Sequence, residues 1–167
     1  MSESINICLS CGLCCDGTLI GFVELDHKEL PGLRELMDIE ESNGSGFFLQ
    51  ACDNYCEGCN IYHKRPKQCA TFKCELLNSV DQEELVFDSA IEVIDLVKQK
   101  KISIEKKSFE LQLHLQSPSF YFRMIELKKQ LKKYKLESAL SLMHVELISD
   151  LEQLDDLLLK NFGLSLN

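Results

Sequence analysis

All nine cysteines of this chain lie between residues 8 and 74. The first group is Cys8-x2-Cys11-x2-Cys14-Cys15, and the second group comprises Cys52, Cys56, Cys59, Cys69 and Cys74. Thiolates are soft ligands that hold Zn²⁺ or iron–sulfur clusters, and four sulfurs per site is the common number. Cysteines separated by two residues let one loop wrap a single metal centre. We therefore expect both groups to converge on shared metal ions.

The adjacent residues Cys14 and Cys15 must point in different directions. This favours two centres, or a bridging position, over one mononuclear site, and nine thiols leave room for two sites with one cysteine to spare. His63 follows Cys59 by four residues and could replace one sulfur, although a surface histidine is the simpler interpretation. A structural metal is favoured over a catalytic one, because closed all-cysteine sites lack an open coordination position.

A disulfide framework is the weaker interpretation of these cysteines. The N-terminal residues lack the basic region and apolar run of a secretory signal, and an odd number of cysteines would leave one unpaired. We expect a cytoplasmic protein, where thiols stay reduced and bind metals. No run approaches the length of a membrane span. The net charge of -9 makes nucleic acid an unfavourable partner.

Metal should supply much of the stability of the first half. Joining the two cysteine groups closes a long loop, residues 16–51, around the metal. A structural zinc site contributes about 10–16 kcal/mol, compared with about 5–15 kcal/mol for the total stability of a typical domain. We therefore expect the first half to be loose without metal. Replacing Cys11 by Ser should lower the metal content and expose residues 8–74 to protease.

The remaining pattern predicts a mainly α protein with little β-structure. An irregular, metal-stabilised cysteine domain should occupy residues 1–80, and a mainly helical region, residues 81–167, should pack on it. Within the first domain, residues 8–17 are too rich in Cys and Gly for regular structure. Residues 19–25 and 47–49 should be extended, and a helix should lie between Asp26 and Asn43.

Three further features are expected after Cys74. A capping box at Asp81 should start a helix over residues 85–97. Two later helices, from Ser117 to about Tyr134 and from about Glu137 to Asn161, should form an antiparallel hairpin that stops at Gly163. Residues 102–116 fit either a strand or a helix, and the alternation from Phe109 to Leu115 favours a strand. The simpler interpretation of the lysines of residues 128–135 is a solvated helix face, and the alternative is a docking patch for RNA or an acidic partner. The acidic residues 150–156 should lie at the far end of the hairpin and so should not neutralise these lysines.

The combined signature C-x2-C-G-x-C-C and C-x2-C-N-I-Y-x2-R-P-x2-C-x2-F resembles the YkgJ-like CxxCxxCC cysteine-cluster family, a zinc- or iron-chelating domain. The resemblance covers about residues 8–74. It implies that the metal ligands include Cys8, Cys11, Cys14, Cys15, Cys59 and Cys69, framed by Tyr62, Arg65 and Pro66. The chain departs from the pattern at two places. Both Cys52 and Cys56 precede Cys59, and Lys73 stands where Pro is expected.

Simple physical roles can be assigned to the framing residues. Arg65 offsets the negative charge of a thiolate-rich centre, Tyr62 shields that centre from water, and Gly12 provides a turn with backbone N–H groups directed at sulfur. The sequence therefore predicts a protein that chelates zinc or iron through its cysteines and whose metal shapes a surface for a protein partner. The alternative is an iron–sulfur redox or methyl-transfer accessory enzyme, since a related cluster occurs in flagellin lysine methylases. No phosphate loop or Ser/His/Asp arrangement is present.

Overall fold

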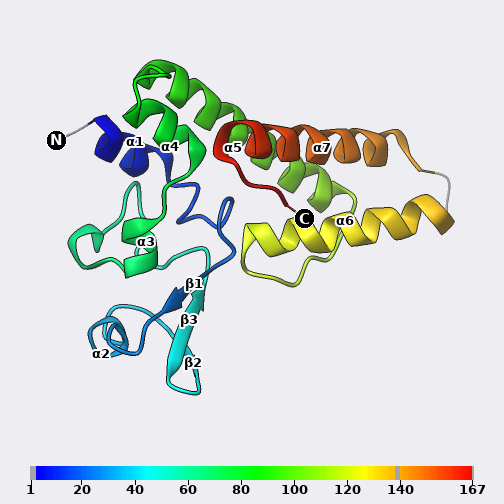
Figure 1. Cartoon of the computed structure of the whole chain (residues 1–167). Helices are drawn as coiled ribbons and strands as arrows, with labels where there is room; N and C mark the ends of the chain where they lie inside the picture. Colours follow the sequence, from blue (N-terminus) through cyan, green and yellow to red (C-terminus); the bar gives the residue numbers. More distant parts are fainter. Residues whose placement is uncertain (1–2, 138–139, 167) are drawn as a thin grey trace. The chain divides into compact units, whose positions relative to one another are not determined.

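The computed structural model describes residues 3–137 and 140–166 (Figure 1). Helices contain 54% of the residues and strands 9%, which confirms the prediction of a mainly α protein with little β-structure. The chain forms two compact units. The first contains Met1–Lys73 and Pro118–Tyr121, and the second contains Cys74–Ser117 and Phe122–Asn167.

The first unit combines short helices with a small antiparallel sheet. Its elements are α1 (Glu3–Cys11), β1 (Phe22–Leu25), α2 (Leu30–Leu33), β2 (Glu40–Ser42), β3 (Ser45–Leu49), the 3-10 helix η1 (Tyr62–Lys64) and α3 (Lys67–Thr71). The strand order is β1-β3-β2, with Val23 opposite Phe48. Asn43 and Gly44 both have positive φ, 52° and 81°, as a two-residue turn between β2 and β3 requires.

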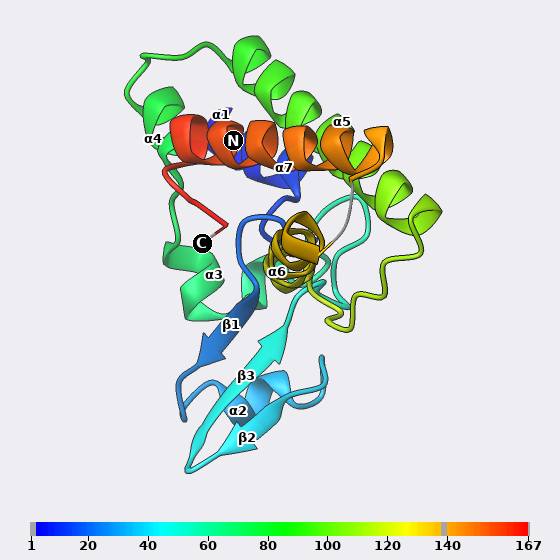
Figure 2. The same ribbon diagram turned by 90° about the vertical axis from the view of Figure 1, so that its right-hand side faces the viewer.

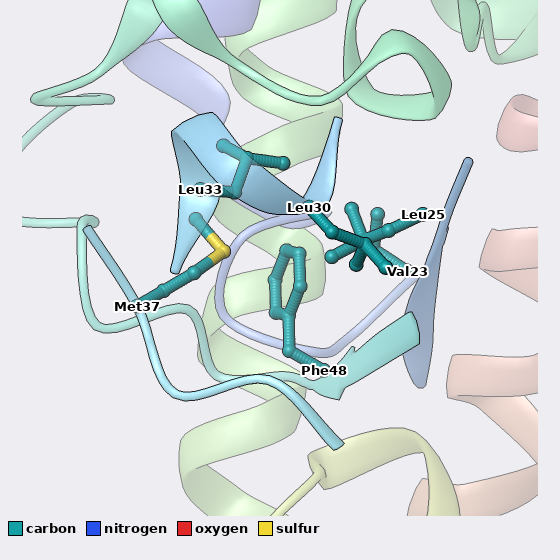
Figure 3. Packing of buried hydrophobic residues seen from close by; sticks show 6 residues of the cluster. All are labelled: Val23, Leu25, Leu30, Leu33, Met37 and Phe48. Carbon is teal, nitrogen blue, oxygen red and sulfur yellow. The ribbon is translucent and has the colours of Figure 1, made fainter. Parts of the chain in front are cut away.

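A small apolar core supports this sheet. It consists of Val23, Leu25, Leu30, Leu33, Met37 and Phe48. Figure 3 shows the ring of Phe48 directed into the space among the side chains from β1, from α2 and from Met37. Cys52 and Cys69 pack against the same cluster. The segment between the two cysteine groups therefore has its own core.

The second unit is helical. It contains α4 (Glu75–Asp81), α5 (Phe87–Glu110), α7 (Leu142–Phe162) and most of α6 (Phe120–Glu137). Helix α7 packs across α5 (Figure 2), and both helices bury one apolar face. Ser141 caps α7 by accepting a hydrogen bond from the His144 N–H, and Gly163 ends the helix with φ 70°. The predicted stop at Gly163 is confirmed.

A buried carboxylate fixes α7 against α5. Asp150, which is 7% exposed, accepts hydrogen bonds from Lys100 Nζ at 2.8 Å, Lys107 Nζ at 2.7 Å and Ser103 Oγ at 2.7 Å. The three donors recur every three or four residues, so they share one face of α5. Burial alone would raise the pKa of Asp150, but these three donors hold it down at about 2.

Helices α6 and α7 run antiparallel, as expected for a hairpin. Tyr134 near the end of α6 meets His144 near the start of α7, with ring centroids 5.5 Å apart. Lys128, earlier in α6, forms an ion pair of 3.0 Å with Asp155, later in α7. The expectation that residues 150–156 leave the basic stretch unneutralised is therefore wrong for Lys128.

Several expected elements differ from the observed ones. Residues 8–11, expected to be irregular, complete helix α1, and the helix expected after Asp26 is the four-residue α2. Asp81 ends α4 and does not cap the next helix, whose N-cap is Val86. The later helices begin at Phe120 and Leu142 rather than at Ser117 and Glu137.

The strand favoured within residues 102–116 is wrong. Helix α5 continues without interruption to Glu110, and none of residues 102–116, all of which the structure describes, lies in a strand. The contacts of Ser103 and Lys107 with Asp150 stabilise this second half of α5. Phe109, which began the alternating pattern, is 84% exposed. The alternation therefore did not reflect a buried sheet face.

Within the described part of the chain, no helix combines the length and the apolar character that crossing a bilayer requires.

Candidate metal centre

The first cysteine group lies where α1 passes into a tight loop. Cys8 and Cys11 are three residues apart in α1 and so share a face of the helix, and Gly12 follows with φ 70°. The carbonyl of Leu13 accepts hydrogen bonds from the N–H groups of Thr18 and Leu19 at 3.0 and 2.9 Å, and the Leu13 side chain is fully buried. This anchor holds the half-buried Cys14 and Cys15 in the loop.

The second cysteine group is bound to the first through the main chain. The Cys52 N–H donates to the Cys15 carbonyl at 2.8 Å, and the Tyr55 N–H donates to the Cys52 carbonyl at 3.0 Å. Tyr55 then pairs with Cys59 in an antiparallel bridge, so the chain folds back on itself around Cys56. The two groups, far apart in the sequence, are therefore adjacent in the structure.

Helix α3 brings Cys69 to the same region. Pro66 precedes the helix as its N-cap, and the Lys67 N–H donates to Glu29 Oε1 at 2.6 Å. The Gln68 side chain accepts a hydrogen bond from the Glu24 N–H of β1 at 2.7 Å. These bonds hold α3 beside the sheet, where Cys69 packs against the core that Cys52 also contacts.

The thiols of Cys15, Cys52, Cys59 and Cys69 interact electrostatically. Burial, followed by the charges of the other three thiols, raises the pKa of Cys15 to about 12. Burial and the negative charges of Cys52 and Cys59 raise the pKa of Cys69 to about 11, whereas the positive charge of Arg65 lowers it. Burial and Cys59 also raise the pKa of Cys52. Burial and the charges of neighbouring thiolates thus disfavour the thiolate forms of Cys15, Cys52 and Cys69, and a cation among them would relieve this repulsion.

The donor set fits zinc or iron by its chemistry, because all four groups are soft sulfur ligands. Among the side chains of residues 7–135 and 140–166, no three His, Cys, Asp or Glu groups form a set that could hold a metal ion as they stand. The proximity of the four thiols is therefore set by the fold, and the final ligand geometry would be set by the ion.

Arg65 and Tyr62, the residues expected to frame the cysteines, contact each other. The Arg65 guanidinium stacks 3.7 Å above the centroid of the Tyr62 ring, and its Nη1 donates to the Tyr62 carbonyl at 3.3 Å. Its buried Nε has no hydrogen-bond partner among the described residues. The positive charge of Arg65 favours the Cys69 thiolate. His63 is exposed and meets Tyr62 edge-on, which agrees with its interpretation as a surface histidine.

The other five predicted ligands are not among the four interacting thiols. Cys8 and Cys56 are exposed, Cys11 is buried and Cys14 is half-buried. Cys74 belongs to the second unit, where it is the N-cap residue of α4. Burial raises the pKa of Cys74, and the nearby N–H groups of Leu77 and Leu76 act in the opposite direction.

Tyr55 is a neighbour of the thiols that the sequence analysis missed. Its hydroxyl occupies the space that a Cβ atom would take at Gly12. The positive φ expected for Gly12 is observed, but its N–H donates to the Cys8 carbonyl at 3.5 Å rather than pointing at sulfur. The sequence does show an aromatic residue directly before Cys56, but the spacing of the cysteines gives no reason to assign Tyr55 a role.

The fold and these thiols define a cysteine-cluster metal-binding protein. Residues 7–107 match the family model "CxxCxxCC: Putative zinc- or iron-chelating domain", so the chain belongs to this family. The match includes all nine cysteines and continues through α4 into α5, well beyond the region of residues 8–74 that carried the resemblance. No curated protein and no solved structure matches the chain.

Proposed function

We propose that Cys15, Cys52, Cys59 and Cys69 bind one zinc or iron ion and that this ion has a structural role. The supporting observation is that these four thiols, from three segments, each lie within electrostatic range of others in the set. Four sulfur donors are the usual complement of a structural zinc site. Membership of a zinc- or iron-chelating family supports the same chemistry.

The bound ion would supply metal–sulfur bonds that join the loop of Cys15, the turn of residues 52–59 and helix α3. Binding requires the thiols to lose their protons, which burial and mutual repulsion oppose while the site holds no cation. Arg65 offsets part of the negative charge of the resulting four-thiolate centre. The ion would therefore stabilise the turns around the small core of the first unit.

The remaining cysteines of the first unit, Cys8, Cys11, Cys14 and Cys56, are candidates for a second ion. We leave out Cys74, because it begins α4 in the second unit. A cytoplasmic location would keep all these thiols reduced. The surface shaped by the metal would bind a protein rather than nucleic acid, because the chain carries a net charge of -9.

Metal analysis of the chain purified without air tests this proposal. A colourless protein that contains zinc bound in proportion to protein would support the structural site. A brown protein with sulfide and sulfur-to-iron charge-transfer absorption would instead support the iron–sulfur alternative, a redox or methyl-transfer accessory enzyme. Freshly purified protein with no zinc or iron, and no uptake of either ion after reduction, would contradict the proposal.

A further inference from the structure

The phenol of Tyr55 spans the two cysteine groups. Its backbone lies in the turn of residues 52–59, where its N–H donates to the Cys52 carbonyl at 3.0 Å. Its hydroxyl reaches Gly12, in the loop that separates Cys11 from Cys15, and occupies the missing Cβ position there. A side chain at Gly12 would collide with Oη, Cζ and Cε2 of Tyr55. The absence of a side chain at Gly12 therefore allows the phenol to reach this loop.

The Tyr55 hydroxyl lies against Gly12, directly after Cys11. A phenol is protonated at neutral pH, and its hydroxyl can donate a hydrogen bond to thiolate sulfur. The Asp16 N–H donates to the Gly12 carbonyl at 2.9 Å, which holds the loop that contains Cys14 and Cys15 in a tight turn next to Gly12.

We propose that Tyr55 is a positioning residue of the metal centre, and that its hydroxyl donates a hydrogen bond to thiolate sulfur of the first cysteine group, at Cys15 or Cys11. This inference rests on the proposed function. Hydrogen bonds to metal-bound thiolates withdraw charge from sulfur and fix its orientation, which tunes both the affinity and the spectrum of the metal. Tyr55 would also link the centre that contains Cys15 to the remaining thiols Cys11 and Cys56.

Cobalt-substituted protein provides the test, because thiolate-to-cobalt charge-transfer bands report the charge on sulfur. Tyr55→Phe removes only the hydroxyl. We expect the variant to bind Co²⁺ with the band pattern of the same sulfur ligands but with shifted charge-transfer energy, and to lose Co²⁺ to a chelator about tenfold more readily than the wild type. A variant with unchanged bands and unchanged chelator competition would overturn the inference.

Two glycine variants provide a second test, which applies even if the Tyr55→Phe variant does not fold. Gly12→Ala introduces a methyl group where the hydroxyl lies, whereas Gly44→Ala adds one in open space at a similar φ, 81° against 70°. The cost of alanine at positive φ is thus common to both. We expect Gly12→Ala to shift the bands and Gly44→Ala to leave them unchanged. Equal spectra for the two variants would contradict the role of Tyr55, while a wild-type protein that takes up no Co²⁺ would instead contradict the proposed metal centre.

Discussion

The main-chain N–H of Cys52 donates a 2.8 Å hydrogen bond to the main-chain carbonyl of Cys15. This bond uses no side-chain atom, so it leaves both sulfurs available as ligands. It also fixes the two cysteine groups beside each other through the backbone, and the small core around Phe48 supports the same region. The fold thus brings the two cysteine groups together before any metal binds, and a metal ion bound as proposed would complete the site.

Substitution of single cysteines should separate ligands from the cysteine that lies in the second unit. We expect Cys52→Ser to lose most of the metal of the four-thiol centre, because three sulfurs bind zinc far more weakly than four. Cys74→Ser should retain the wild-type metal content. Elemental analysis of both purified variants, normalised to protein concentration, measures the difference. Equal loss in the two variants would contradict the proposed ligand set.

Removal of the metal should loosen the first unit selectively. A structural zinc site contributes about 10–16 kcal/mol, so its loss should weaken the first unit even though that unit has a small core of its own. After treatment with a chelator, we expect faster trypsin cleavage after the exposed residues Lys28, Lys64 and Lys67. Mass spectrometry of the early fragments identifies these sites, and restoring zinc should reverse the effect. Cleavage that begins instead within α5 or α7 would show that the metal acts elsewhere.

Asp150 should make the helical unit sensitive to acid. Its pKa is held at about 2 against an ordinary value of 3.8, so the ionised carboxylate stabilises the fold by about 2 kcal/mol at neutral pH. Because the pKa is lowered in the folded state, this contribution is present above about pH 4 and is lost as the pH falls through about 2. Urea denaturation followed by circular dichroism across this range measures it.

Asp150→Asn should remove this acid dependence and lower the free energy of unfolding at pH 7 by about 1–3 kcal/mol, since Lys100 and Lys107 lose their shared carboxylate. Asp156→Asn is the control, because Asp156 is exposed on the same helix. A comparable loss in the control would point to a general effect of charge on α7 rather than to the contacts of Asp150.

Two phenylalanines allow a matched test of the small core. Phe48 is 6% exposed within the cluster of the first unit, and Phe109 is 84% exposed at the end of α5. Truncation of a buried phenylalanine to alanine typically costs about 3–5 kcal/mol, so Phe48→Ala should strongly destabilise the first unit. Phe109→Ala should change the stability by less than about 0.5 kcal/mol. Thermal denaturation of the zinc-loaded proteins compares them.

The chemical nature of the chain could be predicted from the sequence because ligand spacing is local. The x2 separations from Cys8 to Cys14 and the segment from Cys59 to Cys69 indicate soft-metal binding without knowledge of the fold. Which cysteines lie close to one another could not be predicted from the spacing. The proximity of Cys15 and Cys52 depends on a main-chain bond, and that of Cys69 depends on hydrogen bonds between α3 and the residues around β1.

The predicted helix boundaries were wrong where tertiary contacts outweigh the local sequence pattern. The alternation from Phe109 to Leu115 has the period of a strand, but Lys100, Ser103 and Lys107 contact Asp150 and stabilise a helix that continues to Glu110. The ion pair between Lys128 and Asp155 was missed because hairpin register follows from helix packing and not from residue order. Tyr55 was missed because its importance comes from one close approach to Gly12.

The return of residues 118–121 to the first unit has a consequence for biosynthesis. The buried Phe120 belongs to that unit, and the Tyr121 N–H donates to the Gly17 carbonyl at 2.7 Å. A nascent chain that has emerged only as far as α3 lacks these contacts, although every cysteine up to Cys69 is already present. The first unit can therefore reach its final form only after residues 118–121, which follow α5, have left the ribosome.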